Sequence, residues 1–324
     1  MLLSVIVPTH NSQHTIEKCL KSIFNSIFRD FEVIVVDDCS VDSGIDLAKK
    51  FKVKTVSREC RGGPSTARNT GAKYAQGKIL VFIDSDVEIF SDTLNKIVNF
   101  LNFDQDYIAV SGYLSPQCEM LDTLSRYKNL YMHYSYRKEV KTISWAFTSI
   151  FAVYKKIFDE VGGFDTKIKV IEDTLFGVVL TKFGYKVGFD NNIQVKHLHK
   201  YNFKIFIKEE FRRSYNLIIH KLTNVFYRNM AKNKSIAVNF VVSIALLPLL
   251  LLSLLLLIIS INPWIFIFLF TVFLLINFNF LLYLRSYYGT VFAFKSFFVF
   301  ILDIFICGVA IMGGLLKFLT GKRI

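Results

Sequence analysis

Cysteine and proline are scarce in this chain, and one long stretch has no charged side chain. The five cysteines show no C-x-x-C spacing, which argues against a zinc site or a disulfide framework and agrees with a reducing cytosol. The first apolar run, Leu2 to Val7, has no cationic segment before it and stops at Pro8. A secretory signal is therefore not expected, and this run is predicted to be a first β-strand.

No Asp, Glu, Lys or Arg lies between Lys234 and Arg285. As a single helix this stretch would be about 75 Å long, against about 30 Å for the hydrocarbon core of a bilayer, so it must turn back. Asn262-Pro263 near its middle predicts the turn, with Trp264 at headgroup depth. We therefore predict two membrane spans, residues 236–261 and 264–284.

Basic residues flank this predicted hairpin, whereas its turn is uncharged: Arg228, Lys232 and Lys234 precede it, and Arg285 follows it. The positive-inside rule then places both open ends in the cytoplasm. We attribute the formal net charge of +13 to contacts with membrane lipids, and a nucleic-acid partner is not expected.

A third apolar segment, residues 297–316, contains Asp303 and is followed by Lys317, Lys322 and Arg323. One more span would carry this basic end outside, against the positive-inside rule, whereas a re-entrant or interfacial segment would keep it inside. We favour a span and leave the alternative open. Asp303 is interpreted either as a functional intramembrane acid or as a polar packing contact.

Residues 201–235 carry aromatic and aliphatic side chains at helical spacing, from Phe203 to Phe226, with lysines and arginines among them. This pattern is typical of an amphipathic helix at a membrane surface, although packing on the rest of the protein would also explain it. We predict a cytosolic catalytic domain over residues 1–200, an interfacial helical segment over 201–235 and a transmembrane region over 236–319.

In residues 1–200, short apolar runs alternate with helical patterns in a βαβαβ order that continues to a buried strand at Ile79 to Ile83. This order predicts an α/β fold with a Rossmann-like, mainly parallel sheet. Ligands bind beyond the carboxyl ends of such strands. Three polar clusters follow the predicted strands and are expected to share one crevice, although each alone could be a helix cap or a turn: Pro8-Thr9-His10-Asn11, Asp37-Asp38-Cys39-Ser40 and Asp84-Ser85-Asp86.

A glycine-rich element, Gly62 to Gly71, precedes this buried strand and opens a helix at Pro64. It matches neither G-x-x-x-x-G-K-S/T nor G-x-G-x-x-G, so neither an ATPase P-loop nor a dinucleotide fold is supported. The free N–H groups at a helix start attract anions, and Arg68 adds a cation one turn later. The element is therefore predicted to face a diphosphate.

These motifs resemble the family 2 glycosyltransferases, which are inverting GT-A enzymes that use nucleotide-diphosphate sugars. The resemblance covers most of residues 1–200 and rests on Val5 to Asn11, Val35 to Ser40, Gly62 to Gly71, Phe82 to Asp86, Gly162 to Asp165 and Glu172-Asp173. It implies that Pro8, Thr9 and Asp38 hold the nucleotide and that Arg68 lies near the diphosphate. Two further candidate donor-binding residues are His10 and Ser85. The family commonly has tyrosine at the position of His10.

Asp84 and Asp86 follow the buried strand with Cα atoms about 6.6 Å apart and point to the same side of an extended backbone. An oxygen-ligated Mn²⁺ or Mg²⁺ there would neutralise the charge on a leaving diphosphate. The resemblance assigns the metal mainly to Asp86 and a ribose or bridging contact to Asp84. In several relatives a histidine completes the metal site or contacts the diphosphate, so His197 and His199 are further candidate ligands, with a surface role as the alternative.

An inverting transfer also needs a base that deprotonates the acceptor hydroxyl. The resemblance gives this role to Asp173, with Glu172 in support, and helix capping is the alternative for both. An aromatic patch falls where relatives build the acceptor side, and core packing explains it equally well. The patch comprises Tyr127, Tyr131, Tyr134, Tyr136, Trp145 and Phe147.

The acceptor is predicted only as a class, a lipid-linked glycan or another membrane-bound molecule. Processive polysaccharide synthases of the family carry a Q-x-x-R-W signature that residues 209–215 lack, which favours transfer of a single sugar. Polyprenyl-phosphate sugar synthases usually have an acidic residue where this chain has Ser12. Both remain alternatives. A catalytically inactive membrane scaffold is disfavoured because the candidate acids and Arg68 are all present.

Overall fold

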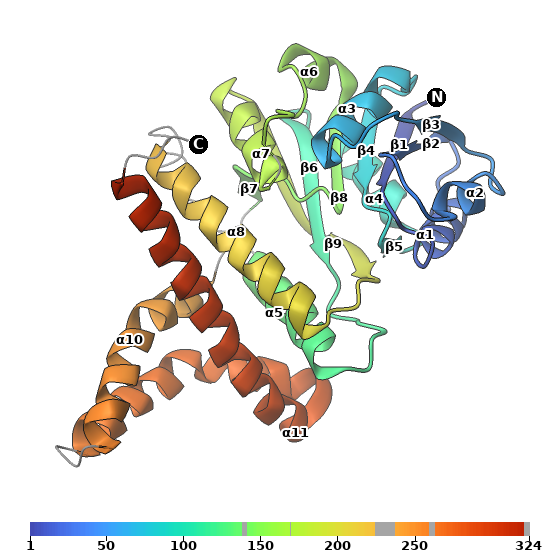
Figure 1. The fold of residues 1–324 in the computed structure, drawn as a ribbon. Helices are drawn as coiled ribbons and strands as arrows, with labels where there is room; N and C mark the ends of the chain where they lie inside the picture. Colours follow the sequence, from blue (N-terminus) through green and yellow to red (C-terminus); the bar gives the residue numbers. More distant parts are fainter. Residues whose placement is uncertain (138–140, 169, 224–236, 259–262, 321–324) are drawn as a thin grey trace. The chain divides into compact units, whose positions relative to one another are not determined.

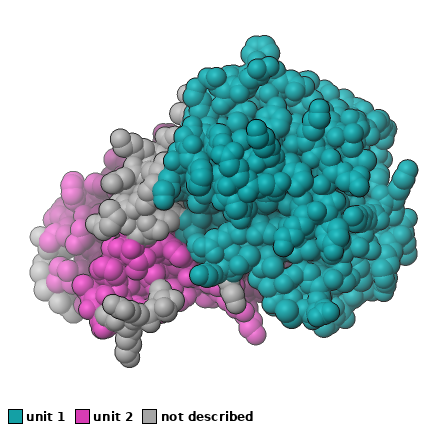
Figure 2. All heavy atoms as spheres, turned by 90° about the horizontal axis from the view of Figure 1, so that it is seen from above, with its two compact units in different colours: residues 1–119, 137–199 teal, residues 120–136, 200–324 magenta. Residues whose placement is uncertain are grey.

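The computed structural model describes residues 1–137, 141–168, 170–223, 237–258 and 263–320 (Figure 1). The chain forms two compact units (Figure 2). Unit 1 comprises residues 1–119 and 137–199, and unit 2 comprises residues 120–136 and 200–324. A division therefore falls at residue 200, where the sequence predicts the catalytic domain to end, but residues 120–136 belong to the unit that holds the C-terminal helices.

Unit 1 is built on a nine-stranded sheet in the order β3-β2-β1-β4-β8-β6-β9-β5, with β7 paired to β9. The strands are β1 (Leu3–Thr9), β2 (Phe31–Asp37), β3 (Lys54–Ser57), β4 (Ile79–Ile83), β5 (Val87–Ile89), β6 (Tyr107–Leu114), β7 (Thr142–Ile143), β8 (Ile150–Tyr154) and β9 (Lys186–His197). The helices are α1 (Ile16–Phe24), α2 (Gly44–Ala48), α3 (Pro64–Tyr74), α4 (Thr93–Phe103), α6 (Lys155–Glu160) and α7 (Glu172–Lys182).

Parallel pairing joins β1 to β2 and β4, β2 to β3, and β6 to β9, whereas β8 and β5 are antiparallel to their neighbours. Every residue of β1 and β4 is buried. Their continuous apolar runs follow from this position, because a central strand has both faces covered. The predicted α/β fold with a mainly parallel sheet is confirmed.

Unit 2 consists of helices α5 (Thr123–Tyr136), α8 (Phe203–Thr223), α10 (Val238–Ile258) and α11 (Pro263–Leu319). Gly289 interrupts α11 with φ 81° and ψ 178°. This conformation is accessible to glycine and very costly for other residues, so α11 is two helices, residues 263–288 and 290–319. The predicted amphipathic segment is helical up to Thr223, and its continuation to Phe226 lies outside the described residues.

By length and composition, α10 and α11 are the two helices among the described residues that could cross a membrane. Helix α10 matches the first predicted span, and α11 covers the second and third. The turn residue Asn262 and the basic residues Arg228, Lys232, Lys234, Lys322 and Arg323 lie outside the described residues.

Hydrogen bonds link α10 to the first part of α11 through the fully buried Asn277. The Oδ1 atom of Asn277 accepts from Asn239 at 2.9 Å, and its Nδ2 atom donates to Ser243 at 2.8 Å. Lipid tails are as apolar as the surface of an apolar helix, so the hydrophobic effect does not drive such helices together in a bilayer. Hydrogen bonds between side chains can hold them together instead. The two helices thus pair as the sequence predicts for a hairpin.

Candidate active site

The ends of β1 and β2 lie side by side, as predicted for the first two polar clusters. Thr9 and Asp37 are partners in the parallel register, and the Asp38 N–H donates to the Thr9 carbonyl at 2.8 Å. The Nδ1 atom of His10 lies 3.0 Å from the Asp38 carbonyl oxygen. The side chains predicted to hold the nucleotide are therefore adjacent, and His10 is the more exposed of them.

The carboxylate of Asp38 holds the glycine-rich element in place. Its Oδ1 and Oδ2 atoms accept from the Gly62 and Gly63 N–H groups at 3.0 and 2.7 Å, and Arg58 forms an ion pair with Oδ1. Asp38 is almost fully buried. In this arrangement, Asp38 sets the start of α3, and the sequence had pointed to it only as a nucleotide contact.

Arg68 of α3 bridges two acids that are far apart in the sequence. Its Nη2 atom lies 2.7 Å from Asp84 Oδ1 and its Nη1 atom 3.0 Å from Glu172 Oε1. The side chain is 4% exposed. Burial opposes its charge, but the charges of Asp84 and Glu172 outweigh burial and raise the pKa of Arg68. The guanidinium predicted to face the diphosphate is thus bonded to the two acids.

Asp84 has a second partner that the sequence did not suggest. Ser149 donates its hydroxyl to Asp84 Oδ2 at 2.9 Å. This contact follows from the antiparallel register of β4 and β8, in which Ile83 faces Ile150, so the next residues outward meet. The only signal in the sequence is a serine directly before a buried strand, which is too common to predict the contact.

Asp86 and the two histidines come together at the β5–β9 pair, where Val87 faces His197. The Oδ2 atom of Asp86 lies 3.5 Å from His197 Nε2 and 3.6 Å from His199 Nδ1. Burial raises the pKa of Asp86, but the hydrogen bond and charges of the histidines outweigh burial and lower it overall. Asp86 is therefore ionised at neutral pH, beside two imidazoles.

Asp86 with either histidine fits a divalent cation. Carboxylate and imidazole are both metal ligands at about 2.0–2.2 Å, so ligands of one ion stand roughly 3–4.5 Å apart. The distances from Asp86 to each histidine fall in that range. Asp84 already accepts from Arg68 and Ser149, so Asp86 is the freer of the two acids. Ser85 lies between them and is partly exposed.

Glu172 and Asp173 open α7, as predicted. Asp173 Oδ1 accepts from the Thr174 N–H at 2.6 Å, and none of the described residues donates a hydrogen bond to its Oδ2. Burial and the negative charge of Glu172 raise the pKa of Asp173 to about 7. Glu172 reaches Arg68, which connects the start of α7 to the acid that follows β4.

The aromatic patch of the sequence is divided between the two units. Tyr127 and Tyr131 are buried in unit 2, where their rings pack with Phe280. Trp145 and Phe147 are buried in unit 1, and Trp145 packs with Phe189. Core packing therefore accounts for these four side chains.

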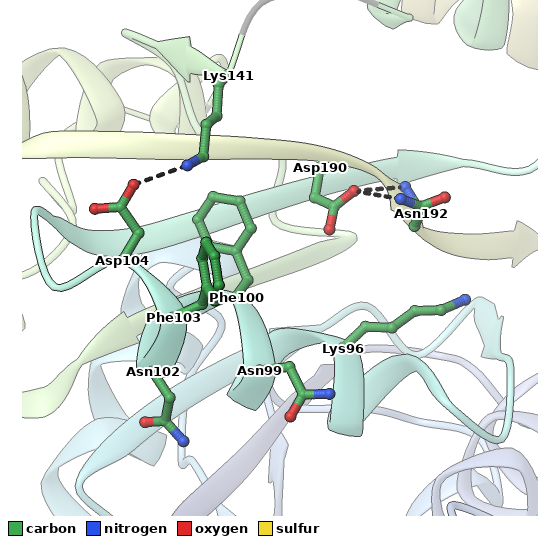
Figure 3. A pocket seen from close by; sticks show the side chains of 9 residues that line it. All are labelled: Lys96, Asn99, Phe100, Asn102, Phe103, Asp104, Lys141, Asp190 and Asn192. Atoms are coloured by element: carbon green, nitrogen blue, oxygen red, sulfur yellow. Dashed lines mark hydrogen bonds and ion pairs between the residues drawn. The ribbon is translucent and has the colours of Figure 1, made fainter.

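A surface hollow of about 720 Å³ lies elsewhere in unit 1 (Figure 3). It is lined by Lys96, Asn99, Phe100, Asn102, Phe103, Asp104, Lys141, Asp190 and Asn192. Inside it, Lys141 donates to Asp104 and Asn192 donates to Asp190. None of the predicted site residues lines this hollow, so it is separate from the acids and histidines described above.

A mainly parallel sheet of this kind, with acids after β4 and at the start of α7, defines the class of GT-A nucleotide-diphospho-sugar transferase folds. A solved mannosyltransferase, PcManGT from Pyrobaculum calidifontis in complex with GDP-Man and Mn²⁺, has this fold. It matches 96% of this chain and 86% of its own with a TM-score of 0.59 and 19% identity. Residues 4–162, just under half of the chain, match the family described as Glycosyl transferase family 2.

Curated relatives match shorter parts of the chain. A poly(ribitol-phosphate) beta-glucosyltransferase of Bacillus spizizenii is 36% identical over 118 residues, which are 34% of this chain and 19% of the relative. The UDP-Glc:alpha-D-GlcNAc-diphosphoundecaprenol beta-1,3-glucosyltransferase WfgD of Escherichia coli is 35% identical over 88 residues, 26% of this chain and 35% of WfgD. The match thus spans about a fifth to a third of these relatives.

Proposed function

We propose that this protein is a membrane-bound, metal-dependent, inverting glycosyltransferase. It moves a single sugar from a nucleotide-diphosphate sugar to a lipid-linked glycan or another membrane acceptor. The observation that carries the proposal is the bridge formed by Arg68, which joins Asp84 on the donor side to Glu172 on the base side. Such a bridge fixes both halves of a transfer site at one distance, and fixed geometry is what a displacement reaction requires.

The donor side consists of the ends of β1, β2 and β4. His10 and the adjoining backbone receive the nucleotide, and the diphosphate lies toward the start of α3, whose Gly62 and Gly63 N–H groups Asp38 already holds. Arg68 is a positioning residue in this scheme, because both of its acids are within hydrogen-bond distance. It holds Asp84 and Glu172 in place and offsets their charge.

Asp86, His197 and His199 are the residues that would hold the metal. When bound, the ion supplies positive charge to the leaving diphosphate. Magnesium prefers oxygen ligands, so the imidazoles in this ligand set argue against Mg²⁺. Among the comparisons, the mannosyltransferase solved with Mn²⁺ supports a divalent cation in the same fold.

Asp173 takes the proton of the acceptor hydroxyl at its Oδ2 atom. The acceptor oxygen then forms a bond to the anomeric carbon while the bond from that carbon to the diphosphate breaks, and the diphosphate leaves with the electron pair. A pKa of about 7 suits this role, because a base works best when its pKa is near the working pH.

The acceptor class follows from the chain's own apolar helices and from its relatives. Helices α10 and α11 are candidate membrane spans, and WfgD carries a diphosphoundecaprenol acceptor in its name. A polyprenyl phosphate is the second candidate acceptor. Its oxygen is already ionised and needs no base, so the two acceptors make opposite predictions for variants of Asp173.

The purified full chain in detergent, incubated with a panel of nucleotide-diphosphate sugars and Mn²⁺, tests the activity. We expect release of nucleoside diphosphate with one of them, and absence of both nucleotide binding and donor hydrolysis would exclude an enzyme. Asp173→Asn should retain donor binding and lower transfer by about 10²–10⁴-fold, the usual size of a general-base effect. Asp159→Asn, an exposed acid on α6, is the matched control.

Mass spectrometry of the products separates the remaining alternatives. One added sugar per acceptor supports single transfer, whereas a ladder of lengths indicates a processive synthase. Transfer to polyprenyl phosphate that survives Asp173→Asn would indicate a polyprenyl-phosphate sugar synthase and would refute the assignment of Asp173 as the base.

A further inference from the structure

Helix α8 exposes two neighbouring stripes of opposite character. Phe203, Ile207 and Phe211 recur every four residues and are 61%, 44% and 40% exposed. Lys204, Lys208 and Arg212 follow each of them by one position and are also exposed. One residue is a turn of about 100°, so the apolar stripe and the basic stripe run side by side along the helix. This is the surface that an anionic bilayer interface accepts, with rings among acyl chains and cations at phosphates.

The second part of α11, residues 290–319, runs beside α8 in the same direction (Figure 1). Successive contacts between the two helices lie progressively closer to the C-terminal end of both. The carboxylates of Glu210 and Asp303 and the Cys307 thiol lie within 4.8 Å of one another. Further on, Gly314 is close to Ile218, where an added Cβ would lie 2.4 Å from the isoleucine side chain. Residues 303–314 of α11 therefore follow residues 210–218 of α8.

Polar contacts hold this helix pair to α5. Lys128 Nζ lies 2.6 Å from Glu210 Oε1, and the Tyr127 hydroxyl donates to Asp303 Oδ2 at 2.9 Å. Lys128, Glu210 and Asp303 are all buried. Lys128 forms an ion pair with Glu210, and Tyr127 bonds Asp303, so these contacts form an internal link between helices. Helix α5 thus holds α8 through Lys128 and α11 through Tyr127, and separating these buried partners is costly, so α8 and this part of α11 stay together.

The depth of α11 in a membrane follows from this pairing. A Lys or Arg side chain is strongly unfavourable at the centre of a bilayer, so α8 with its basic stripe stays outside the hydrocarbon core. The paired residues of α11 then share that shallow depth. The remaining residues, 290–302, reach about 20 Å at 1.5 Å per residue, less than the core thickness of about 30 Å. With residues 303–314 held at the depth of α8, the rest of this helix is too short to cross the bilayer.

We infer that α8 and residues 290–319 lie in the plane of an anionic phospholipid leaflet, with Lys204, Lys208 and Arg212 at lipid phosphates. Only α10 and residues 263–288 then cross the bilayer, and the basic C-terminal end stays on the side of α8. The inference rests on the membrane location in the proposed function, and it decides between the two topologies that the sequence leaves open. Charge complementarity selects lipid as the partner of this surface.

Fluorescence quenching by lipids labelled at shallow and deep positions tests the inference. The full chain, with Cys39, Cys60 and Cys118 replaced by Ser and the buried Cys19 and Cys307 retained, is reconstituted in phosphatidylcholine–phosphatidylglycerol vesicles. Single probes are attached at exposed positions along residues 290–319 and at two reference positions. The variants are Phe294→Cys, Phe305→Cys and Leu316→Cys, with Leu252→Cys in α10 as the deep reference and Phe103→Cys in α4 as the aqueous reference.

An in-plane helix gives equal, shallow quenching at all three positions of α11. A span gives deep quenching at Phe305→Cys equal to that at Leu252→Cys, with shallow values at the other two, and that result would overturn the inference. In probe-free protein, a membrane-impermeant maleimide applied from one side should also label the thiols of both Thr320→Cys and Phe103→Cys. Labelling of the two from opposite sides would likewise refute it.

Charge reversal tests the lipid partner. Lys204→Glu, Lys208→Glu and Arg212→Glu combined should lower shallow quenching of a probe at Phe211→Cys several-fold in vesicles that contain phosphatidylglycerol. If the charge-reversed protein fails to fold, the combination of Lys204→Gln, Lys208→Gln and Arg212→Gln replaces it. This neutral variant should lower the quenching by a smaller factor. Lys50→Glu, Lys52→Glu and Lys156→Glu, exposed lysines of unit 1, form the matched control and should change nothing.

A second copy of the chain is the competing partner for this surface. Disulfide-linked dimers through Phe211→Cys without lipid quenching would favour it and sink the inference. Donor hydrolysis in detergent is measured in parallel. A correct depth profile without hydrolysis would refute the proposed function alone, and hydrolysis with a spanning profile would refute this inference alone.

Discussion

The Arg68 guanidinium donates a 3.0 Å hydrogen bond to Glu172, a residue 104 positions later in the chain. The same guanidinium binds Asp84, so one buried cation ties the strand that precedes Asp86, the proposed metal ligand, to the helix that carries Asp173, the proposed base. A cation buried with two acids is stable only as a set, because each isolated charge would lose its hydration without compensation. The two halves of the site are therefore physically coupled.

Replacing Arg68 by Met should lower both stability and activity. The change leaves two acids without their cation, and we expect a loss of about 3–5 kcal/mol in the free energy of unfolding, measured by denaturant titration in detergent. Adding Glu172→Gln to Arg68→Met should restore part of that loss in a double-mutant cycle. Arg29→Met, an exposed control, should cost no more than about 0.5 kcal/mol. Purely additive effects would contradict the bridge.

The rate of transfer should rise with pH around neutrality. The proposed base Asp173 would act in its ionised form and has a pKa of about 7, so kcat/KM is expected to fall on the acid side with an inflection near pH 7. The charge of Glu172 raises this pKa, so Glu172→Gln should move the inflection to lower pH. An inflection that stays in place would show that another group controls the profile.

The same pKa has a consequence for folding. The folded-state pKa of Asp173 lies above the ordinary value of 3.8, so its favourable contribution is present below about pH 4 and is lost as the pH rises through 7. Asp173→Asn removes the carboxylate, so no negative charge has to be buried at this position at high pH. Its stability should match that of the parent protein at pH 4 and exceed it at pH 8, on the order of 1–3 kcal/mol, by thermal unfolding at both pH values. Equal stability at pH 8 would argue against a raised pKa.

Single substitutions of His197 and His199 should separate their roles at the metal. Loss of a metal ligand or of its immediate partner typically lowers metal affinity by 10–100-fold. We expect His197→Ala and His199→Ala each to raise the Mn²⁺ concentration for half-maximal activity, and a titration with donor saturated gives the size of each effect. His14→Ala, which changes an exposed histidine outside the proposed metal site, serves as the control. A histidine whose removal leaves the titration unchanged is not a ligand.

Ser149 tests whether the position of Asp84 matters for donor binding. Ser149→Ala removes the hydrogen bond to Asp84 Oδ2 and should raise the KM for the donor roughly 5–10-fold, equivalent to about 1 kcal/mol. The value of kcat should change less, because Arg68 still holds Oδ1. Ser149→Thr keeps the hydroxyl and should recover most of the binding. Ser57→Ala, an exposed serine of β3, should have no effect.

Local chemistry in the sequence was sufficient for strands β1 to β4, for their ends and for the two apolar helices, whereas β5 to β9 were not predicted. Buried parallel strands need apolar side chains on both faces, and this leaves continuous runs such as Ile79 to Ile83. Strand ends in one sheet lie at one edge, so the clusters at Thr9, Asp38 and Asp84 could be expected to meet. A stretch without charge that exceeds the bilayer thickness can only fold back.

Tertiary structure alone decided which side chains meet across those strand ends. The contact of Ser149 with Asp84 depends on the antiparallel register of β8, and the link from Arg68 to Glu172 depends on where α7 begins. The placement of residues 290–319 depends on Asp303 meeting the buried Glu210 of α8. Pattern and composition act over a few residues, whereas these contacts arise only when distant segments pack. The sequence by itself therefore determined strands β1 to β4 and the apolar helices, and packing determined the contacts of Arg68, Ser149 and Asp303.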